Sequence, residues 1–208
     1  FVGRYMAIQQ QGETPQNYDF WCAMWLLGTL LGRDVIVPRP YAPVHLNWYV
    51  VLVANSGITR KSTAVNYAKR LLQDYQDPAI ALFDARSSAE GIEHTLAELT
   101  ALHSRSHLAI NVSELVRFLG KEQHTMNVPG LLTDLYDCPS YRTNTTMSRG
   151  REVMRDVYVT FLSASTPVWL QKAVTPDVIE GGFTSRVLFI MSDRRKRRVA
   201  WAAKPPSD

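Results

Sequence analysis

From Trp48 onward the chain alternates short apolar runs with longer stretches whose apolar residues repeat at helical spacing, and this alternation constrains the fold most. The apolar runs predict strands at residues 48–54, 79–83, 107–112, 157–163 and 186–191. The stretches between them predict helices at 61–74, from 87 to about 102, from 115 to about 119, at 131–136 and at 167–173. Such alternation favours a parallel sheet with right-handed crossovers. We therefore predict an α/β fold with a mostly parallel sheet flanked by helices.

The residues before Trp48 predict a helix followed by a linker. An apolar pattern runs from Thr14-Pro15 to Leu31 and stops at Gly32, which is typical of a helix with Thr14 as its N-cap. Its buried face is expected to be core rather than a ligand platform and comprises Tyr18, Trp21, Cys22, Trp25, Leu26 and Leu30. The proline-rich run 38–43 predicts an extended linker. We divide the chain into an N-terminal helical segment and linker (1–45), a core (46–192) and a basic tail (193–208).

Short sequence patterns in the middle of the chain predict a helix N-cap, a buried strand and a β-hairpin. Ser87 followed by Glu90 is a capping-box signature. The helix that it opens carries the apolar stripe Ile92, Leu96, Leu99 and Leu102. Asn111 is unusual in a strand that is buried on both faces, and a polar loop is expected up to residue 127. The segment from Tyr141 to Met154 is rich in Thr, Arg and Ser and predicts a β-hairpin or an exposed loop.

The loop between the first predicted strand and its helix has the chemistry of a phosphate site. It reads Asn55, Ser56, Gly57, Ile58, Thr59, Arg60, Lys61, Ser62 and Thr63. Against the P-loop pattern G-x-x-x-x-G-K-[ST], Asn55 and Arg60 replace the two glycines, and Asn55 is expected to hold the turn with a positive φ. Arg60 and Lys61 open a helix where its dipole disfavours cations, which indicates an anionic ligand. The alternative is an ordinary strand-turn-helix.

Polar residues follow other predicted strands. Glu114 ends an apolar run at a position from which a carboxylate can activate water, although Ser113 stands where many ATPases have the Asp that holds the metal. Ser165 and Thr166 either sense a phosphate or cap the next helix. Arg186 follows a Gly-Gly turn and either stabilises charge on a phosphoryl group, in its own subunit or a neighbour's, or forms a surface salt bridge.

Composition narrows the setting. The net charge of +4 arises in 193–198, which holds five basic residues and one acidic residue, and Arg194, Arg195 and Lys196 there either bind nucleic-acid phosphates or form a solvated tail. Cys22 and Cys138 fit neither a disulfide framework nor a metal site, which favours a reducing, cytoplasmic setting. No structural zinc, signal peptide or membrane span is expected. The chain starts without Met, so we expect it to be a fragment of a longer protein.

Five segments occur in an order that resembles a family of P-loop ATPases from phages, prophages and other mobile elements, often joined to primase or other replication domains. The segments are 55–63, 87–92, 113–114, 161–167 and 182–186, and the similarity spans about Thr14 to Met191. These ATPases look like RecA/AAA-type helicase cores. In that family Arg or Gly before Lys-Ser is common, whereas an Asp is usual in place of Ser113.

The resemblance implies roles for the matching residues. Lys61 would contact the β- and γ-phosphates of ATP, Ser62 would ligate Mg²⁺, and Glu114 would activate water. Ser165 or Thr166 would be the sensor, and Arg186 the arginine finger or sensor. Ring helicases of this type often carry a DNA-contacting loop between the strands of Glu114 and the sensor. The candidates there are Arg142, Arg149 and Arg151, unless the segment is a surface excursion.

These features predict a P-loop NTPase core preceded by a small N-terminal helical segment. We expect it to hydrolyse ATP with Mg²⁺ and to act on DNA, in single-stranded form, as a homo-oligomeric ring in mobile-element replication. The main alternative is a regulatory or assembly ATPase that oligomerises with ATP, recruits a partner and hydrolyses slowly because Ser113 lacks a carboxylate. A DNA-binding module without nucleotide is a third reading. A small-molecule kinase is disfavoured because no lid-like Arg cluster can be seen.

Overall fold

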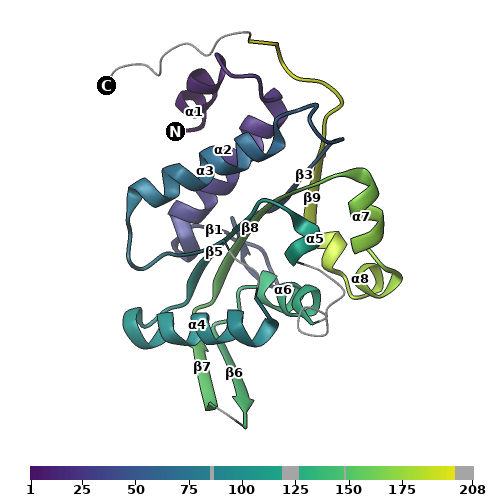
Figure 1. The fold of residues 1–208 in the computed structure, drawn as a ribbon. Coiled ribbons are helices and arrows are strands. Elements are labelled where there is room, and N and C mark those ends of the chain that lie inside the picture. The colour runs from purple at the N-terminus through teal and green to yellow at the C-terminus, as the bar shows by residue number, and fades with distance from the viewer. Residues whose placement is uncertain (85–86, 119–126, 148, 200–208) are drawn as a thin grey trace.

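The centre of the structure is a five-stranded parallel sheet (Figure 1). The computed structural model describes residues 1–84, 87–118, 127–147 and 149–199. The strand order is β4-β5-β8-β3-β9, and every neighbouring pair is parallel. The strands are β3 (Tyr49–Val53), β4 (Ala81–Phe83), β5 (His107–Val112), β8 (Tyr158–Ser165) and β9 (Val187–Met191). The prediction of an α/β fold with a parallel sheet flanked by helices is confirmed.

Helices cover both faces of this sheet because its central strands are apolar on both sides. Every residue of β3, β5 and β8 is buried. Val50 and Leu52 pack with residues of α1 (Val2–Gln9), α2 (Gln16–Leu31) and α3 (Lys61–Tyr75). Val51 and Val53 face the opposite core, to which α4 (Ala89–His103), α5 (Leu115–Phe118) and α6 (Val128–Tyr136) contribute. Asn111 is accommodated in β5 because its side-chain amide donates to the Val65 carbonyl of α3.

The two long helices differ from their predictions at their ends. Pro15, and not Thr14, is the N-cap of α2, while the Thr14 hydroxyl donates to the Asp19 carboxylate at 2.5 Å. Helix α4 is capped by Ser88, whose hydroxyl accepts from the Gly91 N–H at 3.1 Å, so the expected Ser87 cap is wrong. The other residues predicted on the buried faces of these helices are buried. Trp21 and Leu30 are only half-buried, and Leu102 is exposed.

Smaller elements complete the fold. The expected linker 38–43 is instead the loop of an antiparallel pair, β1 (Ile36–Val37) with β2 (Val44–His45). The segment from Tyr141 is a β-hairpin, β6 (Tyr141–Thr146) with β7 (Gly150–Arg155), and extends beyond α4 (Figure 1). The remaining elements are η1 (Gly32–Asp34), α7 (Pro167–Ala173), α8 (Pro176–Glu180) and α9 (Phe183–Arg186). The loop expected over 119–126 lies outside the described residues.

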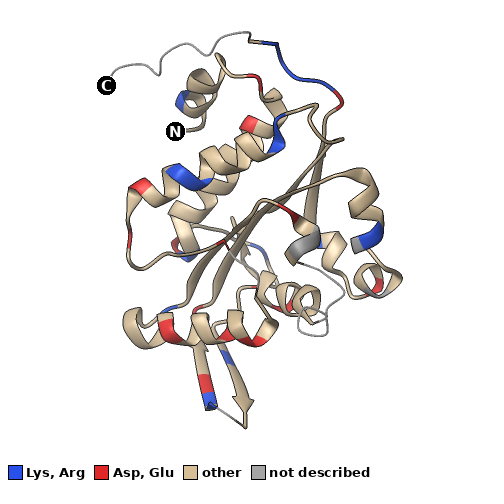
Figure 2. Ribbon diagram, in the orientation of Figure 1, with Lys and Arg blue, Asp and Glu red and all other residues tan. Residues whose placement is uncertain are grey.

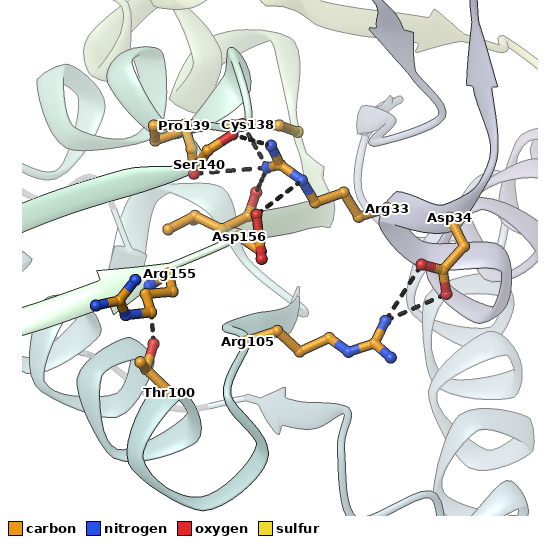
Figure 3. A network of polar contacts seen from close by, with 10 residues as sticks. Arg33, Asp34, Thr100, Arg105, Cys138, Pro139, Ser140, Arg155 and Asp156 are labelled. Carbon is orange, nitrogen blue, oxygen red and sulfur yellow. Dashed lines mark hydrogen bonds and ion pairs between the residues drawn. The ribbon is translucent and has the colours of Figure 1, made fainter.

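We call the edge where the parallel strands start the amino edge, and the edge where they end the carboxyl edge. At the amino edge Arg33, just past α2, reaches the backbone that flanks the hairpin (Figure 3). Its guanidinium donates to the carbonyls of Cys138 and Val157, at 2.9 Å for Val157, and pairs with Asp156 at 3.6 Å. These contacts fix the root of the hairpin to the N-terminal helices.

Within the described residues no helix has both the length and the apolar composition that crossing a bilayer requires.

Candidate functional site

The loop of residues 54–60 joins β3 to α3 at the carboxyl edge. Its first residue is tied to the neighbouring strand, because the Ala54 N–H donates to the Ser165 carbonyl at 3.3 Å. Gly57 and Arg60 have positive φ values of 73° and 56°. The expectation that Asn55 takes a positive φ is wrong. The non-glycine residue with a left-handed backbone is instead Arg60, at the position of the second glycine of the P-loop pattern, where a non-glycine residue costs about 1 kcal/mol.

Lys61 begins α3 and its side chain folds back over the loop. Its ammonium donates to the carbonyl oxygens of Ala54 at 2.8 Å and Asn55 at 3.2 Å. Burial lowers the pKa of Lys61 below its ordinary value. The ammonium is therefore partly desolvated and bound to neutral acceptors, which a phosphate oxygen can replace with a stronger, charge-assisted acceptor.

The other loop residues divide between solvent and core. Ser56, Gly57 and Ile58 are exposed, whereas Thr59 is buried and anchors the loop. A Cβ atom added at Gly57 would meet nothing within 4 Å, so the backbone there is open to a ligand. Ser62 and Thr63 are exposed in the first turn of α3. The loop thus offers an accessible backbone, an ammonium and a hydroxyl, and this donor set fits a phosphate with its Mg²⁺ ion.

The ends of neighbouring strands bring the other predicted polar residues to the same edge. Glu114 and Ser113 follow β5, which is separated from β3 by β8 alone. Neighbouring strands lie about 4.8 Å apart, so roughly 10 Å separates the ends of β3 and β5. Ser165 ends β8 opposite Val53 and donates its hydroxyl to the Thr166 carbonyl. Thr166 is the N-cap of α7 and accepts from the Trp169 N–H at 3.3 Å.

Arg186 lies at the opposite edge. It ends α9 directly before β9, whose first residue is level with Tyr49 at the start of β3. Five strand residues span about 16 Å, so Arg186 does not reach the 54–60 loop of its own subunit. Its guanidinium donates to the Gly182 carbonyl at 3.2 Å, pairs with Asp137 at 3.5 Å and lies 5.8 Å from the Tyr136 ring centroid. These contacts hold the guanidinium at the amino edge.

The candidate DNA-contacting arginines lie on the β6–β7 hairpin, also beyond the amino edge (Figure 2). Arg142 is held by two carboxylates, Glu93 and Asp134, each at 3.1 Å. Arg151 donates to the Tyr141 hydroxyl at 2.9 Å and is exposed. Arg149 is exposed at the turn. Of these three arginines, Arg149 and Arg151 are therefore accessible to a ligand. Arg142 is already paired with two carboxylates of the fold.

Residues 193–199 of the basic tail lie beside the 54–60 loop, because the chain leaves β9 at the carboxyl edge (Figure 2). Arg194 is exposed, whereas Arg195 donates to the loop backbone and Lys196 donates to the Gln9 carbonyl at 3.1 Å. Arg195 also pairs with Glu13 at 3.1 Å, and Glu13 pairs with Arg60 at 2.8 Å. Sequence reasoning missed Glu13, since nothing local marks a lone Glu before a helix as the partner of residues far along the chain.

Two cavities flank the loop. One, of about 650 Å³, is lined by Gly57, Ile58 and the tail, including Arg194, Arg195, Arg197 and Arg198. The other, of about 350 Å³, is lined by the ends of β3 and β9, by Asn55 and Ile58, and by Pro167. The carboxyl edge therefore combines a cationic cavity with a more apolar one, and Ile58 of the loop lines both.

A scan against protein-family models matched none, and a search of curated proteins found no relative.

Proposed function

We propose that the chain is a P-loop ATPase domain that binds ATP with Mg²⁺ at the 54–60 loop and drives a motor that acts on DNA. One observation carries the proposal: the strand order gathers Lys61, Glu114 and Ser165 at the carboxyl edge, around a loop with left-handed residues at Gly57 and Arg60. Open α/β sheets bind ligands at this edge. The resemblance to ATPases of phages and other mobile elements extends the proposal to replication, with single-stranded DNA and primase-type domains as partners.

Each residue has a distinct task in this proposal. The loop backbone and the Lys61 ammonium hold the phosphates, and the Ser62 hydroxyl holds Mg²⁺, which neutralises phosphate charge. The Glu114 carboxylate orients and deprotonates the attacking water. Ser165 supports the loop through its backbone carbonyl, and its hydroxyl or that of Thr166 senses the γ-phosphate.

Arg186 completes the site from a neighbouring subunit, so the proposal requires a closed homo-oligomer, a ring in which the amino edge of one subunit meets the carboxyl edge of the next. This head-to-tail arrangement is the one in which Arg186 can reach phosphate, given its distance from its own loop. The exposed arginines of the hairpin, Arg149 and Arg151, are the proposed DNA contacts.

Steady-state ATPase assays with and without single-stranded DNA test the proposal on the full-length, assembled protein. We expect Lys61→Ala to weaken ATP binding by roughly 10–100-fold, because charge-assisted hydrogen bonds are lost. We expect Glu114→Gln to keep ATP binding and to lower kcat by about 100-fold or more. The matched controls are Lys69→Ala on the same helix and Glu98→Gln on α4, which should change neither quantity. Equal rates in wild type and both variants would refute the proposal.

A regulatory or assembly ATPase is the second candidate, and the exposed Ser113 favours it. Without a carboxylate there, the metal is held less firmly and hydrolysis is slow. This candidate predicts ATP-dependent oligomers, measured by light scattering, whose slow hydrolysis is unaffected by DNA. A rate that rises with single-stranded DNA favours the motor instead.

A further inference from the structure

The tail residue Arg195 clamps the outer side of the 54–60 loop. Its Nε donates to the Ile58 carbonyl at 2.7 Å and its Nη2 to the Gly57 carbonyl at 2.8 Å. The third nitrogen, Nη1, donates to Glu13 Oε1 at 3.1 Å. All three nitrogens of the guanidinium therefore have acceptors, two of them on consecutive peptide units of the loop.

Glu13 joins this clamp to the N-terminal segment. Its Oε2 accepts from Arg60 at 2.8 Å, and its Oε1 accepts from Arg195 and from the Val199 N–H at 3.2 Å. The Val199 N–H and the Arg60 guanidinium lower the pKa of Glu13, so the carboxylate stays ionised. The tail is also tied to this segment by the Lys196 N–H, which donates to the Glu13 carbonyl at 3.2 Å. One carboxylate thus holds a loop arginine and a tail arginine together.

Because the peptide bond is planar, contacts to the carbonyls of the loop also fix the direction of its N–H groups. In a planar trans peptide the C=O and the following N–H point in opposite directions. When Arg195 holds the carbonyls of Gly57 and Ile58 on the tail side, the N–H groups of Ile58 and Thr59 point to the other side. A loop that binds phosphate must present N–H groups to it and keep its carbonyls away.

We propose that Arg195 is a positioning residue for the phosphate site, which it orients through the carbonyls of Gly57 and Ile58 without touching the nucleotide. This inference rests on the proposed nucleotide binding at the same loop. It makes nucleotide binding depend on the docked tail, because the clamp exists only while segment 193–199 lies against the loop. The fork of a guanidinium suits two adjacent carbonyls, and the single ammonium of a lysine does not reproduce it.

The first test measures the backbone without nucleotide. Hydrogen exchange of a peptide that covers residues 54–60 is followed in wild type, Arg195→Lys and Arg194→Ala. Arg194→Ala is the matched control, because it removes the neighbouring exposed charge and leaves the clamp intact. We expect exchange to quicken about tenfold in Arg195→Lys and to stay unchanged in Arg194→Ala. Unchanged exchange in Arg195→Lys would overturn the inference and leave the proposed function standing.

The second test measures the affinity of the same variants for a fluorescent ATP analogue with Mg²⁺. We expect the Kd to rise about tenfold in Arg195→Ala, by less in Arg195→Lys and less than twofold in Arg194→Ala. Added methylguanidinium should restore part of the affinity of Arg195→Ala, which a general loss of stability would not permit. If Arg194→Ala weakens binding as much as Arg195→Ala, the effect is one of bulk charge and the inference fails. If the wild-type protein binds no ATP, both the proposed function and the inference about Arg195 fail.

Discussion

The two edges of the sheet use their cations differently. At the amino edge the arginines that hold the fold together are paired with carboxylates: Arg33 with Asp156, Arg142 with Glu93 and Asp134, and Arg186 with Asp137. At the carboxyl edge Lys61 and Arg195 donate to backbone carbonyls, and the single carboxylate of Glu13 serves both Arg60 and Arg195. A cation on a neutral carbonyl moves to a phosphate more easily than one that must first leave a carboxylate. The cations of the carboxyl edge can therefore exchange their carbonyl partners for an anion, whereas the paired arginines of the amino edge stabilise the fold.

The largest effect should come from Arg186, the amino-edge residue that the proposal assigns to a neighbour's nucleotide. We expect Arg186→Ala to lower kcat by about 10³-fold in the assembled protein while the Kd for ATP stays within a few-fold, because an arginine finger acts mainly on the transition state. Steady-state kinetics together with nucleotide titration separate the two quantities. A similar loss of kcat and of oligomeric state would instead mark Arg186 as an assembly residue.

Mixing the Arg186→Ala and Lys61→Ala variants tests whether Arg186 acts on the nucleotide of a neighbouring subunit. A ring of Arg186→Ala and Lys61→Ala subunits contains interfaces where an intact Lys61 loop meets an intact Arg186, so the mixture should regain part of the wild-type rate. Each variant alone has no complete site. If mixing restores nothing, the head-to-tail contact between the two edges is refuted.

The sequence predicted the sheet and the contents of the carboxyl edge because both depend on local order. Apolar runs fixed the strands, and residues that follow parallel strands must meet at one edge, which placed Lys61, Glu114 and Ser165 together. The same rule puts Arg186, which precedes a strand, at the other edge. The clamp of Glu13 and Arg195 was beyond prediction, since its partners are 182 residues apart. The positive φ of Arg60 was also missed, because tertiary contacts override residue preferences there.

A second prediction concerns acid stability at the amino edge. Burial, followed by the nearby Arg105 charge, lowers the pKa of His107 at the start of β5 to about 4. The unfolded chain has a histidine pKa near 6.5, so it binds more protons than the folded chain between pH 6.5 and 4. The His107 contribution to the free energy of unfolding should therefore fall by about 3 kcal/mol as the pH drops through this window, while buried Asp19, whose pKa is raised to about 6, contributes in the opposite direction. Urea unfolding at several pH values measures the slope.

His107→Gln sharpens this prediction by removing the titrating group. The variant should lose the His107 contribution, so its free energy of unfolding should fall less on acidification than that of wild type, whereas His103→Gln, in the last turn of α4, should keep the wild-type slope. The ring of His107 packs on Tyr158 with centroids 4.9 Å apart, so the variant has a lower free energy of unfolding at neutral pH as well. The comparison therefore uses slopes and not absolute values. An unchanged slope in His107→Gln would assign the acid sensitivity elsewhere.

The smallest effects should separate two arginines of the hairpin. Glu93 is a buried carboxylate that accepts from Arg142 and from the Asn144 amide, so among the described residues Arg142→Ala leaves it the Asn144 amide as its donor. We expect that variant to lose about 2 kcal/mol of unfolding free energy. Arg149→Ala, at the exposed turn, should stay within about 0.5 kcal/mol of wild type. Urea unfolding of both variants measures this difference.

The salt dependence of single-stranded DNA binding then distinguishes a structural arginine from one that contacts phosphate. An arginine that neutralises one phosphate contributes about 0.7 to the slope of log K against log salt for a single strand. Arg149→Ala should lower the slope by about that amount, because its side chain is exposed. Arg142→Ala should leave the slope unchanged under folded conditions, since two carboxylates already neutralise its charge. A lower slope in Arg142→Ala, with Arg149→Ala unaffected, would reverse the assignment and place the DNA path along α4 rather than at the hairpin turn.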